Sequence, residues 1–163
     1  MRKGKYMKKH LTKYIISAVV ILAACLWFIP PVPLVEEGIS ADSISVLHIE
    51  MGVESVTGHS AETYMDPATY TFSSEDEELQ RILDILQQNT CRRTFRGLVG
   101  APIIGGDSST SEYQIHIAVY DEEELIANII CDGEGGVLRD RACRMNRKVQ
   151  QAMMEELRTI YQP

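Results

Sequence analysis

"EYQIHIAVYDEEELIANIIC", residues 112–131, contains the clearest β-strand pattern in the chain. In its first half, apolar side chains alternate with smaller or more polar ones and occupy the odd positions Tyr113, Ile115, Ile117 and Val119. A period of two is typical of a strand that buries one face. The acidic turn "DEEE" (121–124) leads into a second apolar run, "LIANIIC" (125–131). The segment therefore predicts an antiparallel pair of strands.

Two amphipathic helices are predicted on either side of this pair in the sequence. The first follows Ser74, a candidate N-cap with Glu77 three residues later, and ends near Gln88 or Asn89. Its apolar stripe has helical spacing and consists of Leu79, Ile82, Leu83 and Leu86. The second follows Asn146, another N-cap residue, and has the stripe Val149, Ala152, Met153, Leu157 and Ile160. Each helix therefore has one face that needs a core.

Further strands are predicted at 43–52, 69–72, 91–95, 137–139 and 142–145, with a polar loop between Gly52 and Pro67 and a fifteen-residue loop at 97–111. Repeated hairpins with two amphipathic helices favour an α+β fold. We expect an antiparallel sheet with both helices packed on one face, preceded by an N-terminal transmembrane helix.

The N-terminal prediction depends on an asymmetry of charge. Residues 1–13 hold six of the 16 lysines and arginines and none of the 23 acids. The apolar run "YIISAVVILAACLWFIPPVPLV" (14–35) follows. Positive charge before an apolar segment keeps that end in the cytoplasm. We therefore expect a basic cytoplasmic head (1–13), a transmembrane or signal-anchor segment (14–30), a Pro-rich and acidic spacer (31–42) and an extracytoplasmic domain (43–163).

A lipid anchor is the alternative to a retained helix. "LAAC", residues 22–25, resembles the bacterial lipobox, in which lipid is attached to the cysteine, here Cys25, and the chain is cut just before it. The apolar residues after Cys25 argue against this interpretation, because a lipid-anchored chain needs only a polar tether. Both interpretations place residues 36–163 outside the cell membrane and attached to it.

The composition is that of a globular protein, with 45% hydrophobic and 24% charged residues and a net charge of −7. The part beyond Lys13 is strongly acidic. We therefore expect no nucleic-acid partner, because affinity for nucleic acid comes mainly from neutralised phosphates.

No catalytic residue, cofactor or metal ligand is predicted from motifs. The exported part holds three cysteines, Cys91, Cys131 and Cys143, so at most one internal disulfide can form among them. The sequence does not decide which two cysteines would form it. A local bridge between Cys131 and Cys143 is disfavoured, because the turn near Glu134 places Cys131 opposite Val137. A thiol enzyme would need one of these cysteines beside a histidine, namely His48, His59 or His116.

Arginines supply the one candidate binding site. The candidate anion patch consists of Arg92, Arg93, Arg96, Arg144 and Arg147, and would suit a carboxylate-rich or phosphate-rich envelope polymer. The other interpretation is that these side chains form ion pairs with the surplus acids, or that they protect an edge strand.

The order of basic head, apolar anchor, spacer, "TFSSEDEELQRILDIL" (71–86), "CRRTF" (91–95), paired strands and C-terminal helix resembles small membrane-anchored or lipoprotein-like extracytoplasmic domains of unknown function from Gram-positive bacteria. The resemblance implies no functional residues. We expect a non-enzymatic binding or sensing module at the cell envelope, with an envelope protein or anionic polymer as partner. The alternatives are a lipoprotein anchored through Cys25 with a structural or immunity-type role, and a thiol-dependent enzyme.

Overall fold

The computed structural model describes residues 3–28, 30–56, 60–94, 113–139 and 141–162, and for residues 3–12, 28, 51–56 and 60–65 it describes the backbone alone. The elements of this part, in chain order, are α1 (Lys3–Phe28), β1 (Val32–Pro33), β2 (Ser43–Val56), β3 (Ser60–Ser73), α2 (Glu77–Gln88), β4 (Thr90–Arg93), β5 (Tyr113–Asp121), β6 (Glu124–Cys131), β7 (Gly136–Leu138), β8 (Ala142–Arg144) and α4 (Arg147–Tyr161).

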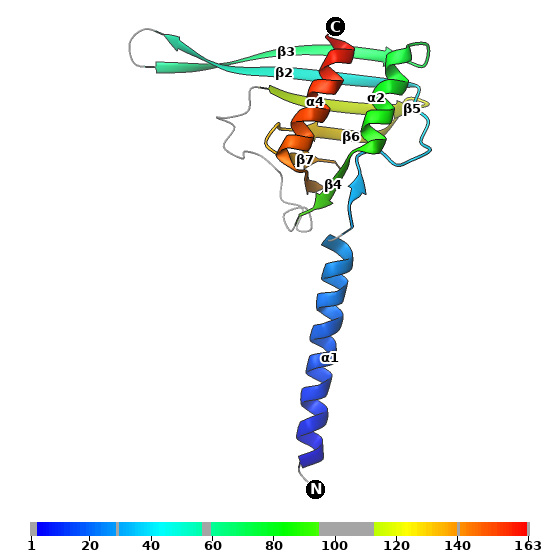
Figure 1. The fold of residues 1–163 in the computed structure, drawn as a ribbon, viewed down its shortest axis with the longest axis vertical. Coiled ribbons are helices and arrows are strands. Elements are labelled where there is room, and N and C mark those ends of the chain that lie inside the picture. The colour runs from blue at the N-terminus through cyan, green and yellow to red at the C-terminus, as the bar shows by residue number, and fades with distance from the viewer. Residues whose placement is uncertain (1–2, 29, 57–59, 95–112, 140, 163) are drawn as a thin grey trace.

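The eight strands of the described part form one sheet in the order β1-β4-β8-β7-β6-β5-β2-β3. Every neighbouring pair is antiparallel. Helices α2 and α4 lie side by side across the sheet, and α1 extends away from it (Figure 1). The structure therefore confirms the predicted α+β domain with an antiparallel sheet and two covering helices.

The core is one layer between the sheet and these two helices. Alternate residues of the central strands are fully buried, as the period-two pattern predicts, and these are Ile44, Val46, Ile115, Ile117, Val119 and Ile129. The helices contribute the apolar stripes Leu79, Ile82, Leu83 and Leu86 from α2, and Met153, Met154, Leu157 and Ile160 from α4. Val149 and Ala152, predicted to belong to the second stripe, are exposed, and Gln150 and Met154 are buried on α4 in their place.

The two helix starts differ in how well they were predicted. Asn146 is the N-cap of α4, and its side-chain oxygen accepts a hydrogen bond from the Lys148 backbone N–H at 3.0 Å, as expected. Helix α2 begins after Asp76 rather than after Ser74. The Asp76 carboxylate accepts hydrogen bonds from the backbone N–H and the hydroxyl of Ser73, at 2.7 and 2.9 Å. It therefore stabilises the turn that leads into the helix.

Strands β2 and β3 are longer than the sequence pattern predicts. They pair with each other from Ser43↔Ser73 to Val56↔Ser60, where the sequence predicts a polar loop. Strand β5 pairs with β2 only as far as Glu50↔Tyr113. Beyond Glu50, β2 and β3 therefore leave the sheet as a two-stranded ribbon (Figure 1).

The predicted spacer contributes to the domain. Val32 and Pro33 form β1, which pairs with Cys91 and Thr90 of β4. Leu34 and Val35, the next two residues, are fully buried in the core. The packed domain therefore begins about ten residues before Ser43, and the chain enters it directly from α1.

The predicted transmembrane helix needs correction. Among the residues that the structure describes, no helix is long and apolar enough to cross a membrane. Helix α1 begins at Lys3 and carries lysines as far as Lys13, so its apolar part is Tyr14–Phe28. Fifteen residues measure about 22 Å, which is short of a hydrocarbon core of about 30 Å. The prediction that residues 14–30 span the membrane is therefore wrong.

The turn between the two central strands has an unfavourable backbone. Asp121 pairs with Glu124, so Glu122 and Glu123 form a two-residue loop, with φ values of 48° and 68°. Two positive φ angles match a type I′ turn, which favours Asn followed by Gly because other residues pay a steric cost there. The turn therefore keeps two residues in a conformation that suits neither of them.

We expect replacement of Glu122 by Asn together with Glu123 by Gly to raise the free energy of unfolding by about 1 kcal/mol, because the new residues adopt positive φ with less strain. Urea denaturation followed by circular dichroism measures the change. The matched control is Glu122→Gln with Glu123→Gln, which removes the same two charges and keeps the steric cost. Equal gains in both double variants would attribute the effect to charge and contradict the backbone argument.

Candidate functional site

The candidate anion patch is divided by the fold. Arg92 of β4 lies directly opposite Arg144 of β8 in the strand register. Both side chains are exposed, and neither forms an ion pair with any residue in the described ranges. Opposed residues of an antiparallel pair project to the same face with Cβ atoms about 5 Å apart. Two arginine side chains therefore leave neighbouring strands on the same face of the sheet, near its β1–β4 edge.

Two further arginines surround Trp27 at the end of α1. The Arg93 guanidinium carbon lies 4.4 Å from the centre of the Trp27 ring, and that of Arg141 lies 5.6 Å from it. The Arg93 side chain also donates a hydrogen bond to the Trp27 carbonyl at 3.5 Å. These cation–π contacts attach the end of α1 to β4 and to the segment before β8. We call Arg92, Arg93, Arg141 and Arg144 the arginine edge. Arg92 and Arg144 project from one face of the sheet, and Arg93, the next residue of β4, projects from the other.

Other arginines have acidic or carbonyl partners. Arg139 donates to the Pro33 carbonyl at 2.6 Å and lies 3.6 Å from the Glu36 carboxylate. Arg147, a member of the predicted patch, forms an ion pair with Glu134 at 3.0 Å. Arg96, another member, lies outside the described residues. The sequence identified the cluster, but it had no signal for the role of Arg141, because its contact with Trp27 joins residues far apart in the chain.

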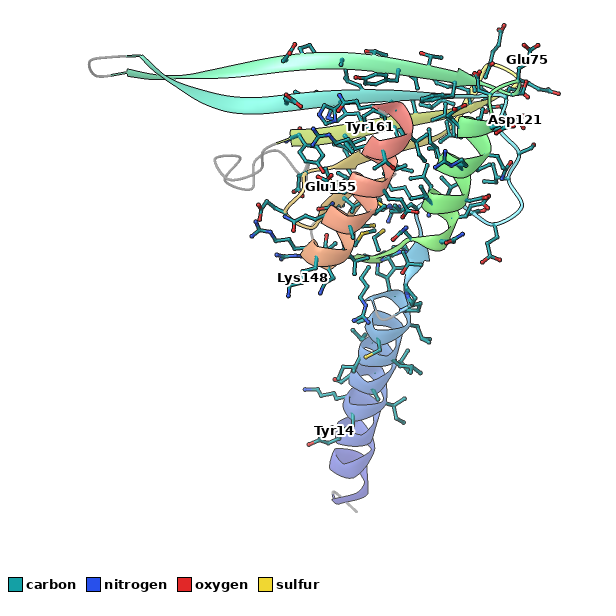
Figure 2. All side chains as sticks on the ribbon, turned by 45° about the horizontal axis from the view of Figure 1, so that its top comes forward. Tyr14, Glu75, Asp121, Lys148, Glu155 and Tyr161 are labelled. Carbon is teal, nitrogen blue, oxygen red and sulfur yellow. The ribbon has the colours of Figure 1, made fainter. Side chains whose placement is uncertain are left out.

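A second group of polar side chains is buried where the β2–β3 ribbon leaves the sheet. His48 is 1% exposed, and its Nδ1 atom lies 2.9 Å from the Tyr161 hydroxyl. Its ring stacks on Tyr113 with a centroid distance of 5.0 Å. The Tyr113 hydroxyl donates to the Glu155 carboxylate at 2.9 Å. Figure 2 shows Glu155 and Tyr161 on α4, with Tyr161 at the end of the helix beside β2 and β3.

This group, the His48 cluster, joins three strands to α4. The Tyr70 and Tyr161 rings lie 4.9 Å apart, and the Gln162 amide donates to the Tyr70 hydroxyl at 2.9 Å. His48 Nε2 is buried without a hydrogen-bond partner in the described part of the chain, and it lies 3.5 Å from the half-exposed Glu50 carboxylate. Sequence analysis named His48 but missed its partners, because Tyr161 is 113 residues away.

Burial controls the protonation of both described histidines in the sheet. Burial lowers the pKa of His48, although the nearby Glu50 carboxylate opposes the shift. Burial also lowers the pKa of His116, whose Nε2 has no hydrogen-bond partner among the described residues. Register places His48 opposite Ile115 and His116 opposite Leu47, so the two imidazoles project to opposite faces of the sheet.

None of the cysteines pairs directly with a described histidine of the sheet, and the nearest arrangement is Cys131 and His48, which pair with Ile115 from opposite sides and lie two strand spacings apart. All four cysteines lie in the described part, and no disulfide joins any of them. Cys91, Cys131 and Cys143 are buried, whereas Cys25 is exposed on α1. Burial raises the pKa of Cys131 to about 12 despite a hydrogen bond with Gln150. Cys131 pairs with Ile115 and His116 with Ile130, so the Cys131 thiol and the His116 ring project to opposite faces. The geometry therefore offers no activated thiol at these positions. His59 lies outside the described residues.

The described part of the chain offers neither a groove large enough for a small molecule nor a metal site. A groove of about 180 Å³ lies between α2 and α4, which is below the roughly 300–1,000 Å³ of small-molecule sites. It is lined by Arg81, Asp84, Ile85, Gln88, Glu156 and Ile160. The described side chains form no group of three or more histidines, cysteines or acids that could hold a metal ion.

Comparisons with known proteins add no relative. No protein-family model matches the chain, and neither the search of curated proteins nor that of solved structures finds a similar one. The resemblance drawn from the layout of the sequence therefore stays a prediction.

We expect the free energy of unfolding to decrease as the pH falls through the ordinary histidine value of about 6.5. His48 and His116 have lowered pKa values in the folded chain, so the unfolded chain takes up protons first. Above that pH both states are neutral at these residues and the effect disappears. Urea denaturation at pH 7.5, 6.5 and 5.5 measures the slope.

The slope should be smaller in the His48→Gln and His116→Gln variants, and smallest when both changes are combined. Comparing slopes rather than absolute stabilities removes any constant cost of the substitutions. An unchanged slope in the double variant would contradict the assignment to these histidines.

Proposed function

We propose that this chain is a non-enzymatic binding module attached to the outer face of the cell membrane, and that it binds anionic groups of an envelope polymer through the arginine edge. One observation carries the proposal, namely that Arg92 and Arg144 are directly opposed, exposed and without an ion pair among the described residues. In a domain rich in acids, such a pair is the feature most in need of an explanation.

The physical argument is that like charges directly opposite each other destabilise a sheet. A bound phosphate or carboxylate offsets this repulsion, because two guanidinium forks together offer several charge-assisted hydrogen bonds. Among the described residues, ion pairing with an acid accounts for Arg147, which contacts Glu134, but not for Arg92 or Arg144.

The position of the arginine edge suits an attached protein. Strand β4 and the end of α1 meet at the lower end of the domain, and the rest of α1 extends away from it (Figure 1). A domain held by its amino-terminal segment would present this end toward the surface that holds it. The ligand would then be a polymer that lies close to that surface.

We propose lipid on Cys25 as the form of attachment. The sequence argument against it was the apolar stretch after Cys25. Leu34 and Val35 are buried in the core, Val32 pairs with β4, and Trp27 packs against arginines. The second half of this stretch is therefore part of the domain, which removes that part of the objection.

We expect the double substitution Arg92→Glu with Arg144→Glu to weaken binding to long-chain polyphosphate or polyglutamate by about tenfold or more. The reason is that each lost charge-assisted hydrogen bond is worth about 1.5–3 kcal/mol. The full chain is used, in a non-ionic detergent. Titration at two salt concentrations measures affinity and its electrostatic part. Phosphatidylglycerol vesicles, compared with phosphatidylcholine vesicles, provide a third arm that detects binding to lipid headgroups instead of polymer.

The matched control is Arg81→Glu with Lys148→Glu, which changes the net charge equally at two exposed positions on α2 and α4. It should retain most of the affinity. Equal losses in both double variants, or no binding by the unmodified chain, would contradict a specific site at the arginine edge.

We expect the chain isolated from a lipoprotein-processing bacterium to begin at a diacylglyceryl-modified Cys25, because processing at a lipobox cuts just before the cysteine. Mass spectrometry of the intact protein measures this. Cys25→Ala should block both the modification and the cut. A mature chain that keeps residues 1–24 would contradict the lipid anchor and leave the binding proposal to be tested separately.

A further inference from the structure

Two of the buried cysteines are neighbours on adjacent strands. Cys143 of β8 lies opposite Arg93 of β4, and Cys91 precedes Arg93 by two residues on the same strand. Residues i and i+2 of a strand share a face, so both thiols project into the core. Cys91 is 1% exposed and Cys143 is 6% exposed, and the neighbouring Cys143 side chain is the main reason that the pKa of Cys91 is raised. The pairing of β4 with β8 therefore brings two thiols, one from each strand, close together on the core face of the sheet.

Cys131 lies in the same row but at a greater distance. It pairs with Val137 of β7, and Val137 pairs with Cys143 of β8. Two strand spacings, about 9.6 Å, separate Cys131 from Cys143. Cys91 and Cys143 are diagonal neighbours, about 7–8 Å apart, close to the roughly 7 Å within which a disulfide can join two Cα atoms. A small backbone shift therefore joins Cys91 to Cys143 but not Cys131. The Cys131 side chain also has a different polar neighbour, Gln150. Of the three thiols, Cys131 is the one that the sheet keeps apart.

The sheet around Cys91 and Cys143 has few hydrogen-bonded pairs. Strand β4 pairs with β8 only at Arg92↔Arg144 and Arg93↔Cys143, and with β1 only at Val32↔Cys91 and Pro33↔Thr90. Yet the chain from α1 enters the domain through β1, so a pull on the amino-terminal segment acts first on these short pairings. A covalent link between β4 and β8 would reinforce them.

We propose that Cys91 and Cys143 are a redox site, which forms an intramolecular disulfide with a low-molecular-weight disulfide or a thiol–disulfide oxidoreductase as oxidant. One protein thiolate attacks the external disulfide, giving a mixed disulfide and releasing one external thiol. The second protein thiolate then attacks the mixed disulfide at the protein sulfur, so that the protein S–S bond forms and a second external thiol leaves. The two protein thiols lose two electrons and two protons in total, and the external disulfide is reduced to two thiols.

The reaction should be slow in the folded chain. Contact with Cys143 and burial together raise the pKa of Cys91, so its thiolate is scarce at neutral pH. Oxidation therefore requires local opening of the β4–β8 edge, which the shortness of its pairings favours. Once formed, the disulfide persists in an oxidising compartment such as the one proposed for this domain.

The test uses the full chain with Cys25→Ser, so that the exposed thiol of α1 takes no part. The protein is incubated with mixtures of oxidised and reduced glutathione, unfolded with a thiol-alkylating reagent present, and mapped by peptide mass spectrometry. We expect a single linked peptide pair containing Cys91 and Cys143, with Cys131 alkylated. Oxidation should also raise the melting temperature by about 5 °C or more.

Variants give the matched comparison. Cys131→Ala should keep both the linked peptide and the rise in melting temperature, whereas Cys91→Ala and Cys143→Ala should each abolish both. Mapping the chain that retains all three domain thiols needs no core substitution, so it remains decisive if an alanine variant fails to fold. A disulfide that contains Cys131, or three alkylated cysteines after prolonged oxidation, would overturn the proposal.

Discussion

The fold depends on one layer of apolar side chains between a single face of the sheet and the helices α2 and α4. Alternation along β2 and β5 supplies one side of this layer, with Ile44, Ile115 and Ile117 fully buried. Helical spacing along α2 and α4 supplies the other side. Burial of this surface is the main favourable contribution to folding in a domain of this size. The positions of the other groups follow from it, because the register that buries Ile115 also decides where Arg144 and Cys143 lie.

Sequence patterns predict an element correctly when its structure depends on residues that are close together in the chain. The central strands and both helices were predictable because each has its own periodicity, for example Leu79, Ile82 and Leu86 along α2. The ribbon of β2 and β3 was not predictable, because Gly52, Glu54 and Pro67 interrupt the alternation and the pairing partner lies across the turn. Leu34 and Val35 were assigned to a spacer, because two apolar residues after prolines carry no period.

The candidate sites show the same limit. Clustering along the chain identified the arginines at 92–96 and 144–147 as a candidate site. Strand register, which the sequence does not show, places Arg92 opposite Arg144, whereas Arg147 forms an ion pair with Glu134. Register likewise placed Cys91 beside Cys143 and kept Cys131 apart, a choice that the sequence left open. His48 was visible in the sequence, but its contacts with Tyr113 and Tyr161 depend on the docking of a helix at the far end of the chain.

The contact of Trp27 with two guanidinium groups has a consequence for spectroscopy. Trp27 is the single tryptophan of the chain, and it lies at the junction of α1 with β4 rather than in the core. Intrinsic tryptophan emission will therefore report on the state of this junction, while the domain itself is followed by its backbone or tyrosine signals. A difference between the two transitions would reveal detachment of the amino-terminal segment from a domain that is still folded.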